Sequence, residues 1–298
     1  MILNKESYRF SGHDTFHCKE QWLLKGVQLT EKEGFNVLRT VGAISTLGVG
    51  KNMVRSIQHW LKAFNLVDEK GELTNLSKFL FIEKEFDPYL ENDASLWLLQ
   101  YHLCNNQYAS IYKLIFCDYF SDKAVLDFSE HQISRFLNSR LKSSGQKEVA
   151  QKTLQADYKV FLRTYLSQAK NYKTVEDDFN VPLVSLNLIE DTGRLNDKGQ
   201  NVYRINKSNH DIPVEILAYC LIEEFPDEVA ISFDLISRTI GSYLCVSNDW
   251  LDHLLSLLAS TYKEFVYKND AGIRQIQVKS KNRDNFKIMI LKKYYDKY

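Results

Sequence analysis

The chain has 298 residues, of which 44% are hydrophobic and 26% are charged, with 4 prolines and 12 glycines. This composition is typical of a globular protein of two or three domains and excludes a long disordered or linker-rich chain. Lys and Arg balance Asp and Glu at 38 each. The neutral total excludes a uniformly basic protein, so any nucleic-acid surface has to be local.

Targeting signals are not evident at the start of the chain. Asn4, Lys5 and Glu6 interrupt the apolar stretch that a signal peptide needs, and no run of 18 apolar residues is long enough to span a membrane. The five cysteines are scattered and form no CxxC pair. We therefore expect a cytoplasmic, soluble protein with reduced thiols and no structural zinc.

Charge is distributed unevenly along the chain. Residues 35–64 hold four bases and no acid, and residues 131–170 hold eight bases and two acids. Residues 268–298 hold nine bases and three acids, whereas residues 68–93 hold eight acids and three bases. Such segregation predicts basic faces on a neutral protein. Ordinary charge clustering on solvated helices is the alternative.

The first cluster of reactive side chains lies at residues 10–19, FSGHDTFHCK. Histidine and aspartate can act as general bases and metal ligands, so His13 and Asp14 are candidate catalytic residues. In the alternative, Asp14 or Thr15 caps the following helix and His13 makes a hydrogen bond that stabilises the fold. A catalytic triad of Ser11 with these two is disfavoured, because sequence neighbours rarely converge in triad geometry.

A first module is predicted from about residue 30 to residue 82. Thr30 followed by Glu33 matches a capping box, so we expect a helix over 31–41, followed by a glycine-punctuated turn region. The sequence GVGK ending at Lys51 invites comparison with a phosphate-binding loop, but the required upstream glycine and the following Ser or Thr are missing.

Residues 51–64 predict an amphipathic helix, because their apolar residues recur at spacings of three and four. The other face offers polar candidates for DNA binding: Lys51, Asn52, Arg55, Gln58 and His59. Residues 65–74 then predict a short hairpin. Helix, turn, basic helix and hairpin form the order of a winged helix-turn-helix, which places its second helix in the major groove of DNA. Winged helices also dock proteins, and that alternative stays open.

A predicted helical core pair at residues 89–120 leads to a second basic module. Ser129 is placed to cap one helix, a Ser-Ser-Gly break follows at residues 143–145, and a second helix is expected over 149–166. The candidate DNA-binding residues of this module are Arg140, Lys142, Lys152, Lys159 and Arg163.

Internal similarity supports repeated modules. Residues 65–81 and 187–203 align without a gap, share four identities and both suggest strand, acidic turn and strand. A third module is expected from helices at 212–224, at 231–239 and after Ser247, a hairpin over 265–278 and a basic tail.

Together these patterns predict a mostly α protein with small β-hairpin wings, in which repeated winged helix-turn-helix modules are joined by helical segments. The expected domains are an N-terminal motif with a winged helix at 1–85, a helical region with a second winged-helix-like module at 86–206, and a C-terminal winged-helix-like module with a basic tail at 207–298.

Three motifs also resemble a known family. They are FSGHDTFHCKEQWLLKG at 10–26, LGVGKNMVRSIQHWLKAFNLV at 47–67 and EDDFNVPLVSLNLI at 176–189. Together they resemble the SspB-type family of bacterial DNA phosphorothioation proteins, formerly a family of unknown function. Lys19 stands where we expect arginine in many relatives, a change that preserves the charge.

The resemblance implies a role in anti-phage defence, in which sulfur replaces a non-bridging phosphate oxygen of DNA. It implies nicking of DNA beside sulfur-transfer and ATPase proteins. From the basic modules we expect binding to double-stranded DNA and, if the protein nicks it, a divalent metal, Mg²⁺ or Mn²⁺. In that case His13 and Asp14 would lie near the scissile phosphate. No compact nuclease motif is evident in the sequence. The first alternative is a non-catalytic winged-helix adaptor or regulator that recruits enzymes to DNA, and the second is a purely protein-docking module.

Overall fold

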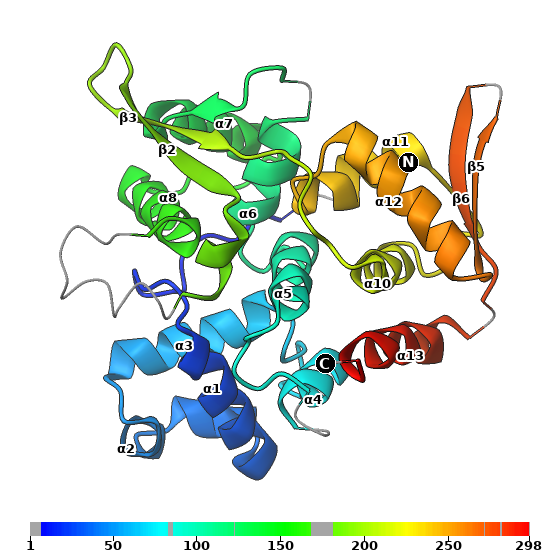
Figure 1. Cartoon of the computed structure of the whole chain (residues 1–298). Coiled ribbons are helices and arrows are strands. Elements are labelled where there is room, and N and C mark those ends of the chain that lie inside the picture. The colour runs from blue at the N-terminus through cyan, green and yellow to red at the C-terminus, as the bar shows by residue number, and fades with distance from the viewer. Residues whose placement is uncertain are drawn as a thin grey trace. The chain divides into compact units, whose positions relative to one another are not determined.

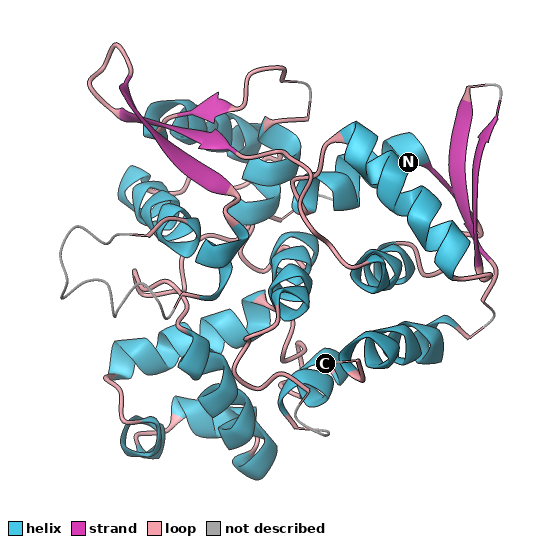
Figure 2. Ribbon diagram, viewed as in Figure 1, coloured by secondary structure: helices cyan, strands magenta, loops and turns pink. Residues whose placement is uncertain are grey.

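A computed structural model describes residues 7–82, 86–121, 123–167, 181–270, 272–280 and 282–297. The described residues are mostly helical and include two three-stranded antiparallel sheets (Figures 1 and 2). The chain divides into two compact units, Met1–Asn206 and Lys207–Tyr298. The predicted mostly α class is confirmed. Within the described ranges, none of the helices combines the length and apolarity needed to cross a membrane.

The first half of the first unit is helical, and α1 and α3 pack closely within it. Its first half contains α1 (Glu20–Glu33), η1 (Phe35–Arg39), α2 (Gly42–Leu47), α3 (Lys51–Ala63) and α4 (Asn75–Phe81). A Cβ atom added at Gly26 of α1 would lie 2.8 Å from Ile57 of α3, so the missing side chain lets the two helices approach each other. The α3 stripe predicted from spacing is buried, with Trp60 fully enclosed.

The predicted capping box at Thr30 is wrong. Thr30 lies buried within α1, and its hydroxyl donates a 2.7 Å hydrogen bond to the Gly26 carbonyl one turn earlier. A mid-helix threonine can satisfy its hydroxyl in this way, so the pattern alone does not mark a helix start. The helix instead ends at Glu33, and Gly34 follows at φ 80°.

The N-terminal hairpin is minimal. Val67 pairs with Leu73 in a single antiparallel bridge, and α4 follows directly. Thr74 caps α4 by accepting a hydrogen bond from the Ser77 amide. The helix expected over 31–41 is wrong, because α1 ends at Glu33 and η1 follows, and α2 lies within the region expected to be a turn. The helix predicted from residue 51 is confirmed as α3, whereas the hairpin predicted after it is a single bridge.

A buried helix leads into the first sheet. The second half of the unit contains α5 (Asp93–Asn105), α6 (Ile111–Lys113), η2 (Leu114–Tyr119), β1 (Asp127–Phe128), α7 (Glu130–Ser143), α8 (Gln151–Tyr165), η3 (Pro182–Leu186), β2 (Ile189–Leu195) and β3 (Asn201–Ile205). The sheet order is β1-β3-β2, with α7 and α8 between β1 and β2 in the sequence. The β2–β3 hairpin lies where the sequence predicted a wing. Of the third motif, residues 176–180 lie outside the described residues.

The second unit repeats this order. It contains α10 (Val214–Glu224), β4 (Ala230–Ser232), α11 (Phe233–Ile236), η4 (Ser237–Gly241), α12 (Asn248–Thr261), β5 (Phe265–Asp270), β6 (Ile273–Val278) and α13 (Arg283–Tyr295). Its sheet order is β4-β6-β5, so the first strand again lies beside the last.

Three local expectations in this unit can be compared with the structure. The Ser247 cap is confirmed, because its hydroxyl accepts a hydrogen bond from the Trp250 amide. The helix expected over 231–239 is only partly right, because Ile231 lies in β4 and pairs with Ile276. The basic tail folds as α13 and buries Tyr294 and Tyr295. The predicted three-domain division stays a prediction.

Candidate nucleic-acid interface

The motif at residues 10–19 is hydrogen-bonded to two helices of the first unit. On α3, the Trp60 indole donates a hydrogen bond to the Phe16 carbonyl at 3.2 Å. On α8, the Asp157 carboxylate accepts hydrogen bonds from the Ser11 amide at 3.0 Å and interacts with His13 Nε2 at 3.0 Å. The motif therefore links helices that are far apart in the sequence.

His13 is buried, and both of its ring nitrogens are engaged. Its Nδ1 atom accepts a hydrogen bond from the Thr15 amide at 3.0 Å, which leaves Nε2 as the donor to Asp157. This matches the structural alternative for His13, in which its hydrogen bonds stabilise the loop. As it stands, the imidazole offers no lone pair to a metal or to a substrate proton.

Asp14 has a different environment from its neighbour. Its Oδ2 atom lies 3.6 Å from Nη1 of Arg55, and the two side chains are 29% and 57% exposed. Residues 11, 12, 14 and 15 all have positive φ, which turns the loop sharply. The alternative in which Asp14 or Thr15 caps the next helix is wrong, because the residue before α1 is Lys19 and it makes no side-chain cap.

His59 does not lie on an exposed polar face, and that expectation is wrong. It is only 4% exposed and lies under the loop: a Cβ atom at Gly12, where φ is 98°, would come within 2.9 Å of His59 Nδ1. Neither ring nitrogen has a hydrogen-bond partner among the described residues. Burial, followed by the nearby charges of His13 and Arg9, lowers the pKa of His59 to about 3. The imidazole is therefore neutral at physiological pH.

The cations predicted at the start of α3 are exposed to solvent. Lys51, Asn52 and Arg55 are exposed, whereas Gln58 is half-buried and donates its amide to the Leu38 carbonyl at 2.7 Å. The first backbone N–H groups of an α-helix have no intrahelical partners, and Gly50, which precedes α3, provides no side-chain cap for them.

A hollow of about 350 Å³ adjoins this face. Arg39, Lys51 and Arg55 are among the residues that line it, and none of its lining residues is an acid. Sequence reasoning counted Arg39 among the bases of the segment but did not assign it to the site. The hollow therefore combines three cations with a helix N-terminus, an arrangement suited to a phosphate group.

The second set of predicted residues separates into two groups. On α8, Lys152 and Lys159 are exposed and Arg163 is half-exposed, and their spacing of seven and four places them on one side of the helix. On α7, Lys142 is exposed, but Arg140 lies 3.5 Å from Asp118 and so has a carboxylate partner.

Asp157 is the site residue that sequence reasoning missed. It is buried between Leu154, Tyr158 and Phe161 on the apolar side of α8. An acid within an apolar helical stripe signals a buried partner, because an unpaired buried carboxylate is costly. That signal was present in the sequence, although the identity of its partner was not.

The described ranges contain no preformed site for the expected divalent metal. They contain no group of three or more His, Cys, Asp or Glu side chains placed to hold a metal ion. Around the motif, His13 is engaged with Asp157 and Thr15, and Asp14 is a single carboxylate already paired with Arg55. These residues do not by themselves fit a metal.

The chain belongs to a family described as proteins of unknown function, DUF4007, whose model matches residues 10–295. No curated protein matches the chain. A crystal structure of SspB with magnesium bound is similar to the chain at 21% identity and a TM-score of 0.82, covering 98% of this chain and 88% of that one. A second SspB crystal structure matches over the same shares at 21% identity and a TM-score of 0.80. At this identity the likeness establishes the fold, and it confirms the resemblance that the motifs predicted.

Proposed function

We propose that this chain is a DNA-binding component of a bacterial DNA phosphorothioation system of the anti-phage type. Two findings support the assignment to such a system. The three sequence motifs resemble the SspB-type family, and the fold matches SspB structures over 98% of the chain. Sulfur-transfer and ATPase proteins of the same system are the proposed partners.

The observation that carries DNA binding is the cationic hollow at the start of α3. The short helix α2, a turn at residues 48–50 and α3 follow in the order of a helix-turn-helix. In that arrangement the N-terminal residues of the second helix approach DNA. Here those residues are Lys51, Asn52 and Arg55, all exposed.

The two sheets support the proposal of repeated winged-helix modules. In each, one strand precedes two helical segments and a hairpin, and the first strand pairs with the last. In this order the second helical segment before the hairpin is the one that enters the major groove. In the first sheet's module that segment is α8, with Lys152, Lys159 and Arg163 on one side.

The C-terminal module favours a second function, that of an adaptor. The corresponding helix is α12, which contains Asp249 and Asp252 but neither lysine nor arginine. Its Leu257 is 43% exposed. An acidic helix is repelled by DNA phosphates, so we propose that this module binds a partner protein.

The proposal also includes nicking of DNA. Arg55 both lines the cationic hollow and pairs with Asp14, so Asp14 lies at the edge of the site proposed for a phosphate. If the protein cleaves DNA, Asp14 is the side chain that can approach the substrate, with His13 holding the loop in place.

Two measurements test these proposals. A duplex DNA titration at two salt concentrations should show affinity falling by about 10³-fold between 50 and 200 mM salt for roughly six phosphate contacts. Absence of binding at low salt would contradict the DNA-binding function. Incubation of supercoiled plasmid with the protein and Mg²⁺ or Mn²⁺ tests nicking. Binding without metal-dependent nicking would leave the adaptor as the function.

A further inference from the structure

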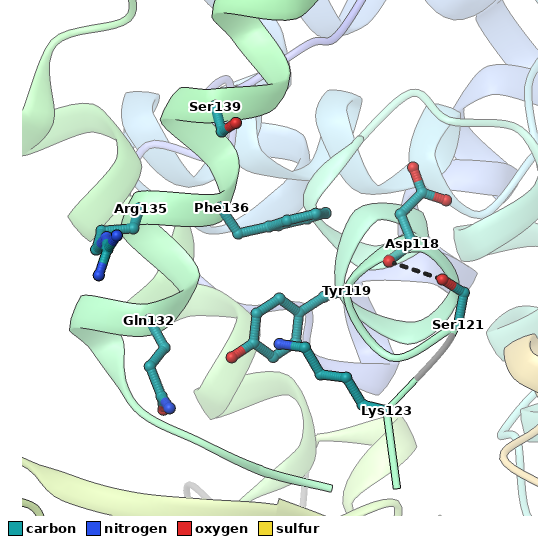
Figure 3. Close-up of a pocket in the computed structure, with 8 residues that line it drawn as sticks. All are labelled: Asp118, Tyr119, Ser121, Lys123, Gln132, Arg135, Phe136 and Ser139. Carbon is teal, nitrogen blue, oxygen red and sulfur yellow. Dashed lines mark hydrogen bonds between the residues drawn. The ribbon is translucent and has the colours of Figure 1, made fainter. Parts of the chain in front are cut away.

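A second hollow in the first unit lies beside α7 and is separate in its residues from the face of α3. Its volume is about 580 Å³, within the range of roughly 300–1,000 Å³ typical of small-molecule sites. Figure 3 shows its walls: Asp118 and Tyr119 at the end of η2, Ser121 and Lys123 just after it, and side chains of α7 opposite.

The α7 wall is a distinct face of that helix. Gln132, Arg135 and Phe136 line the hollow at helical spacing, together with Ser139 one turn further on. The core face of the same helix carries Ile133, Leu137 and Leu141, which are buried. Phe136 is only half-buried: its ring packs against Tyr119, lies 5.4 Å from the Arg140 guanidinium and lines the hollow.

Aromatic rings and a cation meet inside the hollow. The Tyr119 and Phe136 rings pack edge to face with centroids 5.2 Å apart. The Lys123 ammonium lies 3.0 Å from the centre of the Tyr119 ring, on its face. Although most of the Lys123 side chain is exposed, partial burial of the ammonium lowers its pKa.

The balance of charge among the described residues that line the hollow favours an anion. Asp118 is their acid, and the Arg140 guanidinium 3.5 Å away offsets its charge. Arg135 is exposed, and its guanidinium has neither an ion pair nor a hydrogen bond among the described residues. Lys123 contacts aromatic rings and has no carboxylate partner in the same residues. Two cations without a carboxylate partner among the described residues therefore line a hollow that also contains the half-buried ring of Phe136.

We propose that this hollow binds one nucleotide unit, with the base against Phe136 and the phosphate between Arg135 and Lys123. A planar ring with an attached anion is the ligand chemistry that matches both features, because bases stack on aromatic side chains while cations hold the phosphate. The side-chain oxygen of Gln132 accepts a hydrogen bond from the Ser129 hydroxyl. Its amide nitrogen can donate a hydrogen bond to a base edge.

An adjoining hollow points to a nucleotide within a strand as one source. It has a volume of about 790 Å³, shares Arg135 and Ser139 with the first, and is also lined by Lys142 and Glu148. A strand leaving the Phe136 ring would therefore meet one further cation, Lys142, in a hollow that also contains the Glu148 carboxylate. A free nucleotide is the other source of the same chemistry. The site goes beyond the proposed function, because it does not depend on duplex binding by α3.

The test uses the full chain with two probes: deoxyadenosine monophosphate, followed by calorimetry, and a short end-labelled single-stranded oligonucleotide, followed by fluorescence anisotropy. We expect Phe136→Leu to weaken binding about tenfold, since it removes the ring and keeps an apolar side chain. Phe136→Tyr should retain affinity. Arg135→Gln should weaken binding several-fold, whereas Arg238→Gln, an equal change of charge at an exposed site in the second unit, should have no effect.

Each outcome decides the proposal. Binding of the mononucleotide identifies a free nucleotide as the ligand, and binding of the oligonucleotide alone identifies a base within a strand. The proposal is overturned if neither probe binds, or if deoxyribose 5-phosphate, which has no base, competes as well as the nucleotide. It is also overturned if Arg135→Gln and Arg238→Gln act alike. The last two comparisons hold even if Phe136→Leu does not fold. A failure of duplex binding at α3 would leave all of these results interpretable.

Discussion

The Nε2 atom of His13 lies 3.0 Å from Oδ1 of Asp157, a residue 144 positions later in the chain. The adjacent residue, Asp14, pairs instead with Arg55 of α3. Two neighbouring side chains of one loop thus contact two different helices: one contact is buried and the other is partly exposed. This division determines what each residue can do and leads to the first prediction.

Replacing His13 and Asp14 should have different consequences for stability. His13→Ala removes a donor from the buried Asp157 carboxylate, so we expect the free energy of unfolding to fall by about 2–3 kcal/mol. Asp14→Ala breaks only a partly exposed ion pair and should cost about 0–1 kcal/mol. Urea unfolding of both variants measures the difference. Equal losses would show that the buried contact with Asp157 is not what holds the loop.

Removing two cations from α3 should weaken DNA binding in a salt-dependent way. In the double variant Lys51→Gln with Arg55→Gln, the slope of log affinity against log salt should flatten by about two, because each phosphate contact releases its counterions. The apolar stripe of α3 is unchanged, so the fold should persist. Lys25→Gln with Lys32→Gln, two exposed positions on α1, is the matched control. An unchanged slope in the α3 variant would indicate that this module docks protein.

His59 should make stability depend on pH. Its pKa is about 3 in the folded protein against 6.5 for an unperturbed histidine, so the unfolded chain binds the proton more readily. The stability that a neutral His59 contributes is present above pH 6.5 and is lost as the pH falls towards 3. His59→Leu should remove this slope, about 1.4 kcal/mol for each pH unit within the window. Urea unfolding at pH 7.5 and 5.5 measures it.

His253→Gln serves as the control for that experiment, because His253 is exposed. Its pH dependence should follow that of the unmodified protein. If His59→Leu also retains the full slope, the protonation of His59 does not limit stability in acid.

Gly12→Ala should lower the free energy of unfolding more than Gly48→Ala, because both glycines have a positive φ but only Gly12 lies against another side chain. Gly12 has φ 98° and a Cβ there would press on His59 Nδ1 at 2.9 Å, whereas Gly48 has φ 66° and nothing within 4 Å. We expect Gly48→Ala to cost about 1 kcal/mol, from backbone strain alone. Gly12→Ala should exceed this in thermal or urea unfolding, since the contact adds to the strain. Equal losses would mean that the loop can shift off the imidazole.

Local periodicity by itself determined most of the helices and hairpins. The apolar spacing of α3 and the Ser247 cap of α12 were readable because they depend on residues within one or two turns. The capping-box pattern at Thr30 failed for the same reason: a short pattern cannot tell a helix start from a mid-helix hydroxyl bonded to the preceding turn.

The site depended on contacts between distant segments, which only the tertiary structure decided. Helical spacing places His59 on the same side as Asn52 and Arg55, yet it is buried, because the loop at Gly12 and the ring of Tyr108 cover that part of α3. Likewise, the sequence marked His13 as reactive, but its role depends on Asp157, which arrives from α8. Periodicity reports which side of a helix is polar, whereas burial and hydrogen-bond partners depend on what the rest of the chain packs against it.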